Sequence, residues 1–466
     1  MFVMKILVIV LCGGKNTRMR AAKPKFLLEV AGVPILHHIL CTIQEVQRRL
    51  VSHGVCMQNV SLVLNEKNFD NPEIDTVLLD FPELQICKIT QQVTGTGGAV
   101  LSVLYEVEGY DGVLMLYGDM PLIKEDTLYE FVQNYRKRLA LKRNFISLHL
   151  AFIANDSRGY GIIKTDIKEK LRVIRIVESA YEKEKYLSKN PGKIMCNAGA
   201  MITQFHMLKD ALLNVYKVCR IEDEFPLTEV VSFFFGLNMV SEYRICERSE
   251  CINTNNLSDL SRAEEEMQNR IRLTLMNGGV HLIAPHTNFF HYYSSISVGV
   301  VIHPYSIIGK NVMIYPNAVI LPYCYIEGAI IEPQVTIGPF CRIRGDTLLK
   351  SGAKVGNFLE VKNSIIGENT KIGHFGYVGD ATIGDRCNIG AGTVFCNYDG
   401  YEKHRTVVKS KAFIGANVSL VAPVSVGDTS MIGAGSTITQ DVPNYELAIE
   451  RNVQRNIKRK RFTRQR

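Results

Sequence analysis

The chain has 466 residues, of which 46% are hydrophobic and 21% are charged, which allows two or three globular domains with large cores. No apolar stretch approaches the roughly 20 residues of a membrane helix, so we expect no membrane partner. The net charge of +8 arises in the last sixteen residues, RNVQRNIKRKRFTRQR, and the preceding body is neutral, which argues against a nucleic-acid-binding protein. This basic tail, 451–466, is typical of a disordered, solvated segment, and an arm that touches a polyanion is the alternative.

The segment KILVIVLCGGKNTRMR, residues 5–20, fits either a lipoprotein export signal or a buried strand that leads into a phosphate-binding loop. The run from Ile6 to Leu11 is shorter than a signal core, and bulky Leu11 stands where cleavage requires a small residue. We therefore interpret it as a buried parallel strand that ends at Gly13 and Gly14. The cysteines are scattered without a C-x-x-C pair, which predicts reduced thiols and no zinc site. Without an export signal or a membrane anchor, we expect a cytoplasmic location.

From residue 1 to about 255, β-branched runs such as VSLVL, GVLMLYGD and NFISLHLAFI alternate with helical spacing, as in Leu36 to Val51 and Leu128 to Leu139. This alternation predicts an α/β, Rossmann-like domain with a mostly parallel sheet over residues 1–255. Residues 256–278 should form a linker built on an amphipathic helix, for which Ser258 could be the N-cap.

Beyond the linker an aliphatic residue recurs every six positions, with occasional steps of five and one long insertion. These residues are Ile296, Ile302, Ile308, Ile314, Ile320, Ile326, Ile331, Ile337, Ile343, Leu349, Val355, Val361, Ile366, Ile372, Val378, Ile383, Ile389, Ile414, Leu420, Val426, Ile432 and Ile438. A sustained six-residue period predicts a left-handed parallel β-helix over 279–450, with three hexapeptides in each coil and the aliphatic ladder inside. Such solenoids commonly assemble as trimers.

The first candidate site is the segment LCGGKNTRMRAAKPKFL, residues 11–27. Its glycines allow backbone N–H groups to approach phosphate oxygens, and Lys15, Arg18 and Lys25 can neutralise the charge. The spacing matches neither a Walker A motif nor G-x-G-x-x-G, which argues against an ordinary NTPase or dehydrogenase. A glycine-rich turn with solvated charges is the alternative for this segment alone.

The same segment resembles the L-x-x-G-x-G-T-R-M and P-K signature of sugar-phosphate nucleotidylyltransferases, with Asn16 in place of the second loop glycine. Further segments follow in that family's order: VTGTGGA, YGDMPL, GYG, VES, NAG and NTNN. Together with the hexapeptide solenoid, they resemble the family of bifunctional N-acetylglucosamine-1-phosphate uridylyltransferase / glucosamine-1-phosphate acetyltransferases. The resemblance covers nearly the whole chain.

This resemblance implies that the N-terminal domain transfers UMP from UTP to N-acetylglucosamine 1-phosphate, giving UDP-N-acetylglucosamine and pyrophosphate. It implies Asp119 and Asn255 as ligands of Mg²⁺. The implied UTP and sugar-phosphate ligands are Gly14, Arg18, Lys25, Gly95, Thr96, Gly161, Glu178, Asn197 and Asn255.

The second candidate site lies in the segments KIGHFGYVGD and NIGAGTVFCNYDGYEKHRT, which place polar residues in the apolar ladder. Acetylation of glucosamine 1-phosphate needs a free amine, and therefore a base that titrates near neutral pH, which points to His374. A lone histidine on a β-helix is more often a simple surface residue. The resemblance adds Arg344, Lys362, Tyr377 and Asn388 as sugar-phosphate ligands.

For acetyl-CoA the resemblance implies Ala391, Asn397, Tyr398, Lys403, Ala416, Ala434 and Arg451, with Lys403 on an inserted loop that completes a neighbouring subunit's site. The expected assembly is a homotrimer, and the product feeds peptidoglycan and lipopolysaccharide synthesis. One alternative is a hexose-1-phosphate nucleotidylyltransferase with only one activity, whose β-helix is structural or regulatory. A second alternative is a structural scaffold whose sites have decayed.

Overall fold

The computed structural model describes residues 3–14, 19, 21, 23–156, 159–178, 182–184, 187, 192–218 and 225–456. The chain forms two compact units, Met1–Met267 and Gln268–Arg466, which we call unit 1 and unit 2. In the described part of the chain, no helix has the length and apolar character needed to span a bilayer. Every cysteine in that part is a free thiol.

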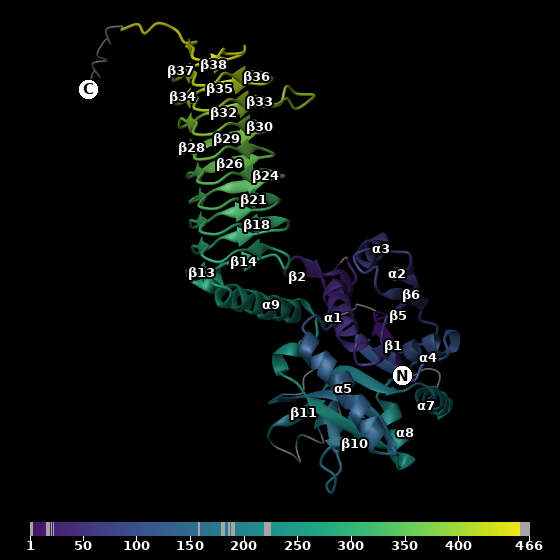
Figure 1. The fold of residues 1–466 in the computed structure, drawn as a ribbon. Helices are drawn as coiled ribbons and strands as arrows, with labels where there is room; N and C mark the ends of the chain where they lie inside the picture. The colour runs from purple at the N-terminus through teal and green to yellow at the C-terminus, as the bar shows by residue number, and fades with distance from the viewer. Residues whose placement is uncertain are drawn as a thin grey trace, which may run out of the picture. The chain divides into compact units, whose positions relative to one another are not determined.

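Unit 1 is built on a β-sheet with the strand order β6-β5-β1-β7-β11-β8-β12-β10-β9 (Figure 1). Its strands are β1 (Met4–Leu11), β2 (Glu29–Val30), β3 (Val33–Pro34), β4 (Val55–Cys56), β5 (Asn59–Leu64), β6 (Gln85–Thr90), β7 (Gly112–Tyr117), β8 (Phe145–Ala154), β9 (Ile162–Thr165), β10 (Arg172–Val177), β11 (Ile194–Gln204) and β12 (Val240–Ile245). Its helices are η1 (Lys25–Leu27), α1 (Ile35–Val51), α2 (Glu66–Phe69), α3 (Pro72–Leu78), α4 (Thr96–Glu106), α5 (Glu125–Leu141), α7 (Phe205–Val218), α8 (Glu229–Gly236) and η2 (Arg248–Glu250).

The central strand β1 explains why the first segment is apolar on both faces. It pairs in parallel with β5 on one side and β7 on the other, and Ile6 to Val10 are almost completely buried. A strand in the middle of a covered sheet has no solvent-facing side chains, so apolar residues follow one another without alternation. The expected buried strand is therefore present, and the predicted helices Leu36 to Val51 and Leu128 to Leu139 correspond to α1 and α5.

The expectation of a mostly parallel sheet holds for only one half of it. Strands β6, β5, β1 and β7 are parallel, but β11 is antiparallel to both β7 and β8, and β9 is antiparallel to β10. The alternation of strands and helices along the chain does not determine which strands pair, because strands far apart in the sequence become neighbours.

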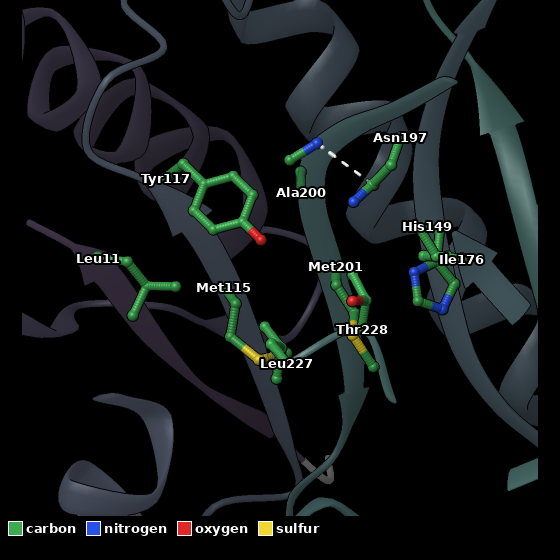
Figure 2. A pocket seen from close by; sticks show the side chains of 11 residues that line it. Leu11, Met115, Tyr117, His149, Ile176, Asn197, Ala200, Met201, Leu227 and Thr228 are labelled. Atoms are coloured by element: carbon green, nitrogen blue, oxygen red, sulfur yellow. Dashed lines mark hydrogen bonds between the residues drawn. The ribbon is translucent and has the colours of Figure 1, made fainter. Parts of the chain in front are cut away.

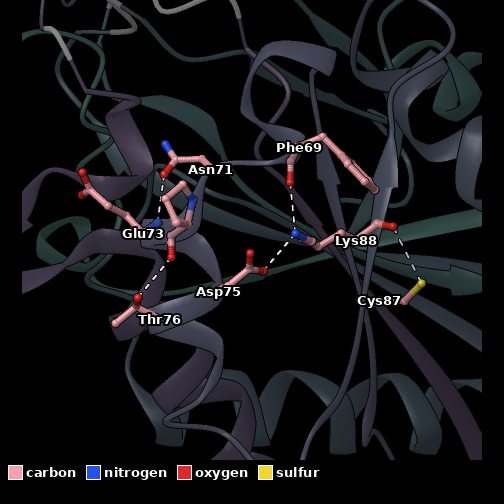
Figure 3. A network of polar contacts seen from close by, with 8 residues as sticks. Phe69, Asn71, Glu73, Asp75, Thr76, Cys87 and Lys88 are labelled. Atoms are coloured by element: carbon pink, nitrogen blue, oxygen red, sulfur yellow. Dashed lines mark hydrogen bonds and ion pairs between the residues drawn. The ribbon is translucent and has the colours of Figure 1, made fainter.

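A polar network fixes α3 to the edge strand β6 (Figure 3). The ammonium of Lys88 donates to Asp75 at 2.9 Å and to the carbonyl of Phe69 at 3.0 Å, and Asn71 caps α3 by accepting from the Glu73 N–H at 2.9 Å. These contacts hold the edge of the sheet and supply no group to the cavity described below.

Helix α9 (Leu257–Asn277) contains the boundary between the two units. Its N-cap is Asn256, whose side-chain oxygen accepts from the Asp259 N–H at 2.9 Å. The sequence-based choice of Ser258 was therefore wrong, because the helix begins one residue before it. Asparagine is a strong N-cap because its short side chain reaches the backbone donor three residues ahead.

Unit 2 is a β-helix in which each strand pairs in parallel with the equivalent strand of a neighbouring coil (Figure 1). Its first sheet holds β13 (His281–Leu282), β16 (Val301–Ile302), β19 (Val319–Ile320), β22 (Thr336–Ile337), β25 (Lys354–Val355), β28 (Lys371–Ile372), β31 (Asn388–Ile389), β34 (Phe413–Ile414), β37 (Met431–Ile432) and β39 (Leu447–Ala448). Its second sheet holds β14 (Phe289–Phe290), β17 (Ile307–Ile308), β20 (Tyr325–Ile326), β23 (Arg342–Arg344), β26 (Leu359–Lys362), β29 (Gly376–Gly379), β32 (Val394–Cys396), β35 (Ser419–Val421) and β38 (Thr437–Ile438). Its third sheet holds β15 (Ser295–Ile296), β18 (Val312–Ile314), β21 (Ala329–Ile331), β24 (Thr347–Leu349), β27 (Ile365–Ile366), β30 (Ala381–Ile383), β33 (Thr406–Val408) and β36 (Val424–Val426). A short helix, η3 (Pro285–Thr287), precedes β14.

The aliphatic ladder forms the core of this solenoid. Every predicted ladder residue from Ile302 to Ile438 is buried, and together they belong to one continuous hydrophobic cluster. The six-residue period therefore gave both the architecture and its interior, and unit 2 is the predicted left-handed β-helix.

Aromatic rings stack outside the solenoid at the corner between the first and second sheets. Tyr305, Tyr323, Phe340 and Phe358 lie in successive coils with centroid distances of 4.8–5.0 Å, and their planes are within 10° of parallel. All of them have left-handed backbones with φ between 52° and 61°, and they are about half exposed. We call this set the aromatic ladder.

Candidate active sites

The main cavity of unit 1 lies where strands β1, β5, β6 and β7 end, and it has a volume of about 570 Å³. Ligands bind at the carboxyl ends of strands in open α/β sheets, because the loops that leave those strands converge there. Its lining includes these sequence-predicted residues: Gly14, Lys25, Gly95, Thr96, Asp119, Gly161, Glu178, Asn197 and Asn255. All predicted residues of the first site that lie in the described part of the chain therefore line one cavity.

Arg18 is the exception, because it lies outside the described residues, as do Lys15 and Asn16. Its predicted contact with UTP remains a prediction.

An ion pair crosses the floor of the cavity. The ammonium of Lys25, on η1, donates to Oδ2 of Asp119 at 2.5 Å, and both side chains are largely buried. Asp119 follows β7, and its carbonyl accepts from the N–H and the hydroxyl of Thr254 at 3.0 and 3.1 Å. This contact fixes the NTNN segment, residues 253–256, beside the end of β7.

Residues at the ends of β9 and β10 and on β11 form another wall of the cavity. Gly161 precedes β9 and Glu178 follows β10, and the antiparallel pairing of these strands makes the two residues neighbours. A Cβ atom on Gly161 would lie 2.5 Å from Oε1 of Glu178, so only glycine leaves room for that carboxylate. Asn197 joins them, since its N–H donates to the Gly161 carbonyl at 2.8 Å. Burial raises the pKa of Glu178, and the nearby Lys183 ammonium opposes the shift.

The VTGTGGA segment enters the cavity at the start of α4. Gly95 is the N-cap of this helix with φ of 89°, and a Cβ atom there would lie 2.4 Å from the Phe225 carbonyl oxygen. Glycine is therefore required both by the left-handed backbone and by the close approach of the neighbouring chain. The hydroxyl of Thr96 accepts from the Leu227 N–H at 2.9 Å, which fixes the segment after residue 225 against the helix start.

A small hollow of about 20 Å³ adjoins the cavity and shares Tyr117, Asn197 and Thr228 with it. Figure 2 shows Leu11 and Tyr117 on one side of this hollow and His149 and Ile176 on the other. Burial lowers the pKa of His149 to about 4, so this imidazole is neutral at physiological pH and belongs to the core.

The oxygen atoms around Asp119 suit a divalent cation. Asp119, Asn253 and Asn255 line the same cavity, and Oδ1 of Asn253 is buried without a hydrogen-bond partner among the described residues. Mg²⁺ binds few protein oxygens and completes its shell with water and substrate phosphates, so one carboxylate with amide oxygens fits it. In the described part of the chain, no cluster of three or more His, Cys, Asp and Glu residues forms a site made of protein side chains alone.

Three polar residues are notable among the lining residues of this cavity that sequence reasoning missed. Tyr117 and Asn253 lie inside motifs that the sequence displays, one in YGDMPL and the other in NTNN, and neither was assigned. Thr228 is buried and its hydroxyl has no hydrogen-bond partner in the described residues, although it faces the cavity. No motif marks Thr228, because the fold brings it to the site from the start of α8.

In unit 2 the predicted sugar-phosphate ligands occupy neighbouring strands. Arg344 on β23 pairs in register with Lys362 on β26, and Tyr377 lies on β29 in the next coil. The guanidinium of Arg344 donates to Glu360 at 2.7 Å. Asn388 is on β31, in the first sheet, half-buried.

A third cation reaches this group from the inserted loop of the same chain. The adjacent Lys403 ammonium lowers the pKa of Lys362, burial and the Arg344 guanidinium add to the effect, and Asp380 opposes it. The three cations Arg344, Lys362 and Lys403 therefore form one positive cluster, which is a ready site for a phosphate dianion.

The predicted base and three of the predicted acetyl-CoA residues occupy equivalent positions in successive coils, at one corner of the solenoid. His374, Ala391, Ala416 and Ala434 stand at the same place after β28, β31, β34 and β37. The Asn417 N–H donates to the Ala391 carbonyl at 2.7 Å, and the Gly435 N–H donates to that of Ala416 at 2.8 Å, so these alanines stack in successive coils. His374 is exposed, and its ring makes no hydrogen bond within the described part of the chain.

The remaining residues predicted to bind acetyl-CoA are Arg451, Asn397 and Tyr398. The guanidinium of Arg451 donates to the carbonyl of Ala434 at 3.0 Å, which brings two predicted acetyl-CoA residues together. Asn397 is buried and its amide donates to Asp380 and, at 3.4 Å, to the Tyr377 hydroxyl. Tyr398 is exposed and forms an antiparallel bridge with Lys403.

Comparisons with known proteins match both units of the chain. Residues 8–144 match the model of the MobA-like NTP transferase domain, 363–397 match that of the bacterial transferase hexapeptide, and 410–440 match that of the hexapeptide repeat of succinyl-transferase. The Bifunctional protein GlmU of Wolbachia pipientis wMel is 36% identical over 450 residues, covering 96% of this chain and 97% of that protein. Its counterpart from Thermotoga sp. (strain RQ2) is 34% identical over 462 residues, covering 96% of each. A nucleotidyltransferase unit joined to a hexapeptide acyltransferase unit, aligned with these relatives along nearly its whole length, places this chain in the family of the Bifunctional protein GlmU.

Proposed function

We propose that unit 1 transfers UMP from UTP to N-acetylglucosamine 1-phosphate and that unit 2 acetylates glucosamine 1-phosphate with acetyl-CoA. The observation that carries the first activity is the cavity in which the Lys25 and Asp119 pair faces Gly161, Glu178 and Asn197. The cation cluster of Arg344, Lys362 and Lys403 carries the second.

In the first reaction a sugar phosphate oxygen attacks the α-phosphorus of UTP, and pyrophosphate leaves. Two anions must meet, so the side chains have to neutralise charge at the point of attack. Lys25 supplies a cation at that place, and Glu178 and Asn197 bind the sugar from another wall of the cavity. Asp119 and Asn255 would hold Mg²⁺, which supplies charge neutralisation and orientation of the phosphates when bound.

In the second reaction the amine nitrogen of glucosamine 1-phosphate attacks the thioester carbonyl. His374 takes a proton from the attacking amine, and the sulfur of coenzyme A leaves as the new amide bond forms. Arg344, Lys362 and Lys403 hold the sugar phosphate, with Tyr377 and Asn388 against the sugar. Ala391, Ala416, Ala434, Asn397, Tyr398 and Arg451 line the path of acetyl-CoA.

We assign the nucleotidylyltransferase domain to residues 1–255, a linker to 256–278, the acetyltransferase domain to 279–450 and a basic tail to 451–466. We also propose a cytoplasmic homotrimer that uses no nucleic acid or membrane partner, in which the inserted loop that carries Lys403 lies where two subunits meet. An enzyme with only the uridylyltransferase activity is not favoured, because the acetyl-site positions are filled and the relatives matched along the whole chain are named bifunctional.

The decisive experiment incubates the pure protein with glucosamine 1-phosphate, acetyl-CoA, UTP and Mg²⁺. Mass spectrometry should detect UDP-N-acetylglucosamine, and omission of acetyl-CoA should stop its formation. Omission of UTP should let N-acetylglucosamine 1-phosphate accumulate. A protein that makes the nucleotide sugar only when supplied with N-acetylglucosamine 1-phosphate would have the first activity alone.

A further inference from the structure

Asp380 is a buried carboxylate next to the acetyl site that has no role in the reaction proposed above. It follows β29 at a corner of the solenoid, is 9% exposed, and has a left-handed backbone with φ of 49°. Its N–H donates to the carbonyl of Lys362 at 3.1 Å, and its own carbonyl accepts from the Thr406 N–H at 3.2 Å. The residue thus joins a proposed phosphate ligand to the strand that follows the inserted loop.

The carboxylate of Asp380 also binds the beginning of that loop. Its Oδ1 accepts from the side-chain amide of Asn363 at 2.5 Å, and its Oδ2 accepts from the side-chain amide of Asn397. The insertion, residues 397–405, starts at Asn397 and ends before Thr406. One residue therefore holds both ends of the insertion, with its side chain at one end and its main chain at the other.

The tip of the insertion has its own internal structure. Asp399 accepts from the N–H groups of Tyr401 and Glu402 at 2.8 and 2.7 Å and contacts the His404 ring at 2.7 Å. These backbone donors and the His404 contact lower the pKa of Asp399. The His404 N–H donates to the Asn397 carbonyl at 2.8 Å. Because the tip is held together internally, its direction depends on the contacts at its base.

This orientation of the insertion is electrostatically unfavourable in the protein without substrate. The insertion places the Lys403 ammonium beside Lys362, and like charges at short distance repel each other. A loop free to move would separate the two ammonium groups, whereas a phosphate dianion between them would make the same arrangement favourable. Something must therefore hold the loop in place before the substrate arrives.

We propose that Asp380 is a positioning residue for acetyl transfer, which fixes the inserted loop so that Lys403 and Lys362 are preorganised for the sugar phosphate. The inference rests on the proposed acetyltransferase activity. Preorganisation matters because misplacing a binding group by about 1 Å can cost on the order of 100-fold in rate.

The test compares Asp380→Asn with Asp346→Asn. Asparagine tolerates the left-handed backbone, so the corner is retained, but its amide offers one acceptor group where the carboxylate offered two. Asp346 lies at the corresponding corner after β23 with φ of 56° and is exposed, so its substitution controls for any effect of the exchange on the turn. Tyr401→Trp provides a reporter on the loop, because Tyr401 is 94% exposed and the chain contains no tryptophan.

In the Tyr401→Trp background, Asp380→Asn should lower the fluorescence anisotropy and Asp346→Asn should leave it unchanged. We expect kcat/KM for glucosamine 1-phosphate to fall about 10- to 100-fold in Asp380→Asn, with KM for acetyl-CoA and uridylyl transfer unchanged. Adding Asn397→Asp to Asp380→Asn reverses donor and acceptor across this contact, and should restore the anisotropy.

Unchanged anisotropy in Asp380→Asn would overturn the proposal. If kcat/KM fell while the anisotropy stayed unchanged, Asp380 would act on Lys362 through its charge and not through the position of the loop. If the unsubstituted chain transferred no acetyl group, the proposed function would fail and with it the role in acetyl transfer. The anisotropy would then still decide whether Asp380 holds the loop.

Discussion

Replacing Gly161 by alanine should weaken uridylyl transfer without unfolding unit 1. The new Cβ atom would lie 2.5 Å from Oε1 of Glu178 and 2.8 Å from Cγ2 of Ile176, distances that real Cβ contacts do not reach. The easiest relief is rotation of the Glu178 side chain, because its carboxylate is the free end of a flexible chain. Stability therefore changes little, and the cost falls on the sugar that Glu178 is proposed to bind.

The magnitude follows from the loss of one hydrogen bond to a charged group, which is worth about 1.5–3 kcal/mol. That free energy corresponds to a decrease of about 10- to 150-fold in kcat/KM for N-acetylglucosamine 1-phosphate. Pyrophosphate release, measured with a coupled assay at varied sugar phosphate, gives this value directly. Acetyl transfer by the same preparation should be unchanged, since Glu178 is far from that chemistry in the chain.

Gly236→Ala is the matched control, because a Cβ atom at Gly236 meets nothing within 4 Å. It should retain normal kcat/KM and normal thermal stability. Normal kcat/KM in Gly161→Ala would refute the placement of Glu178 in the sugar pocket. If Gly161→Ala lost both activities equally and had a lower Tm, the clash would instead have displaced the backbone of the sheet.

Three further predictions address the separate parts of the proposed function. Asp119→Ala, or removal of Mg²⁺ with EDTA, should abolish uridylyl transfer and leave acetyl transfer intact; loss of both activities in a folded protein would contradict two independent sites. His374→Ala should lower kcat for acetyl transfer by about 10²- to 10⁴-fold, while KM for glucosamine 1-phosphate stays nearly constant. Light scattering should report roughly three times the chain mass of 52.4 kDa, and a fully active monomer would exclude a shared site.

The solenoid was predictable because its information is local. Apart from one long insertion after Ile389, each buried aliphatic residue lies five or six positions from the next, so the ladder from Ile302 to Ile438 is visible without knowledge of any long-range contact. The sheet of unit 1 was only half predictable. The apolar run in β1 indicated a central strand, but the insertion of β11 between β7 and β8 depends on pairing across the sequence.

The same distinction separates the site residues that were foreseen from those that were missed. Lys25, Asp119 and Gly161 lie in short motifs whose spacing reflects one loop each, so they can be recognised in the sequence. Thr228 reaches the cavity, and Asp380 reaches Asn397, only through contacts between distant segments. The choice of Ser258 over Asn256 as a helix cap has a simpler cause, since both residue types cap helices and only the backbone shows where α9 begins.

The first two rings of the aromatic ladder, Tyr305 and Tyr323, lie in coils of the solenoid that hold none of the predicted site residues. From β13 to β22 each coil contacts only its immediate neighbours, so the coils act as interchangeable spacers. Excising the coil that carries Tyr323 would shorten the solenoid by about 4.8 Å, the separation of neighbouring strands. Phe340 would then stack on Tyr305, and the aromatic ladder would remain continuous. The number of coils between β13 and β22 can therefore change during evolution, while the proposed site residues on the later coils stay the same.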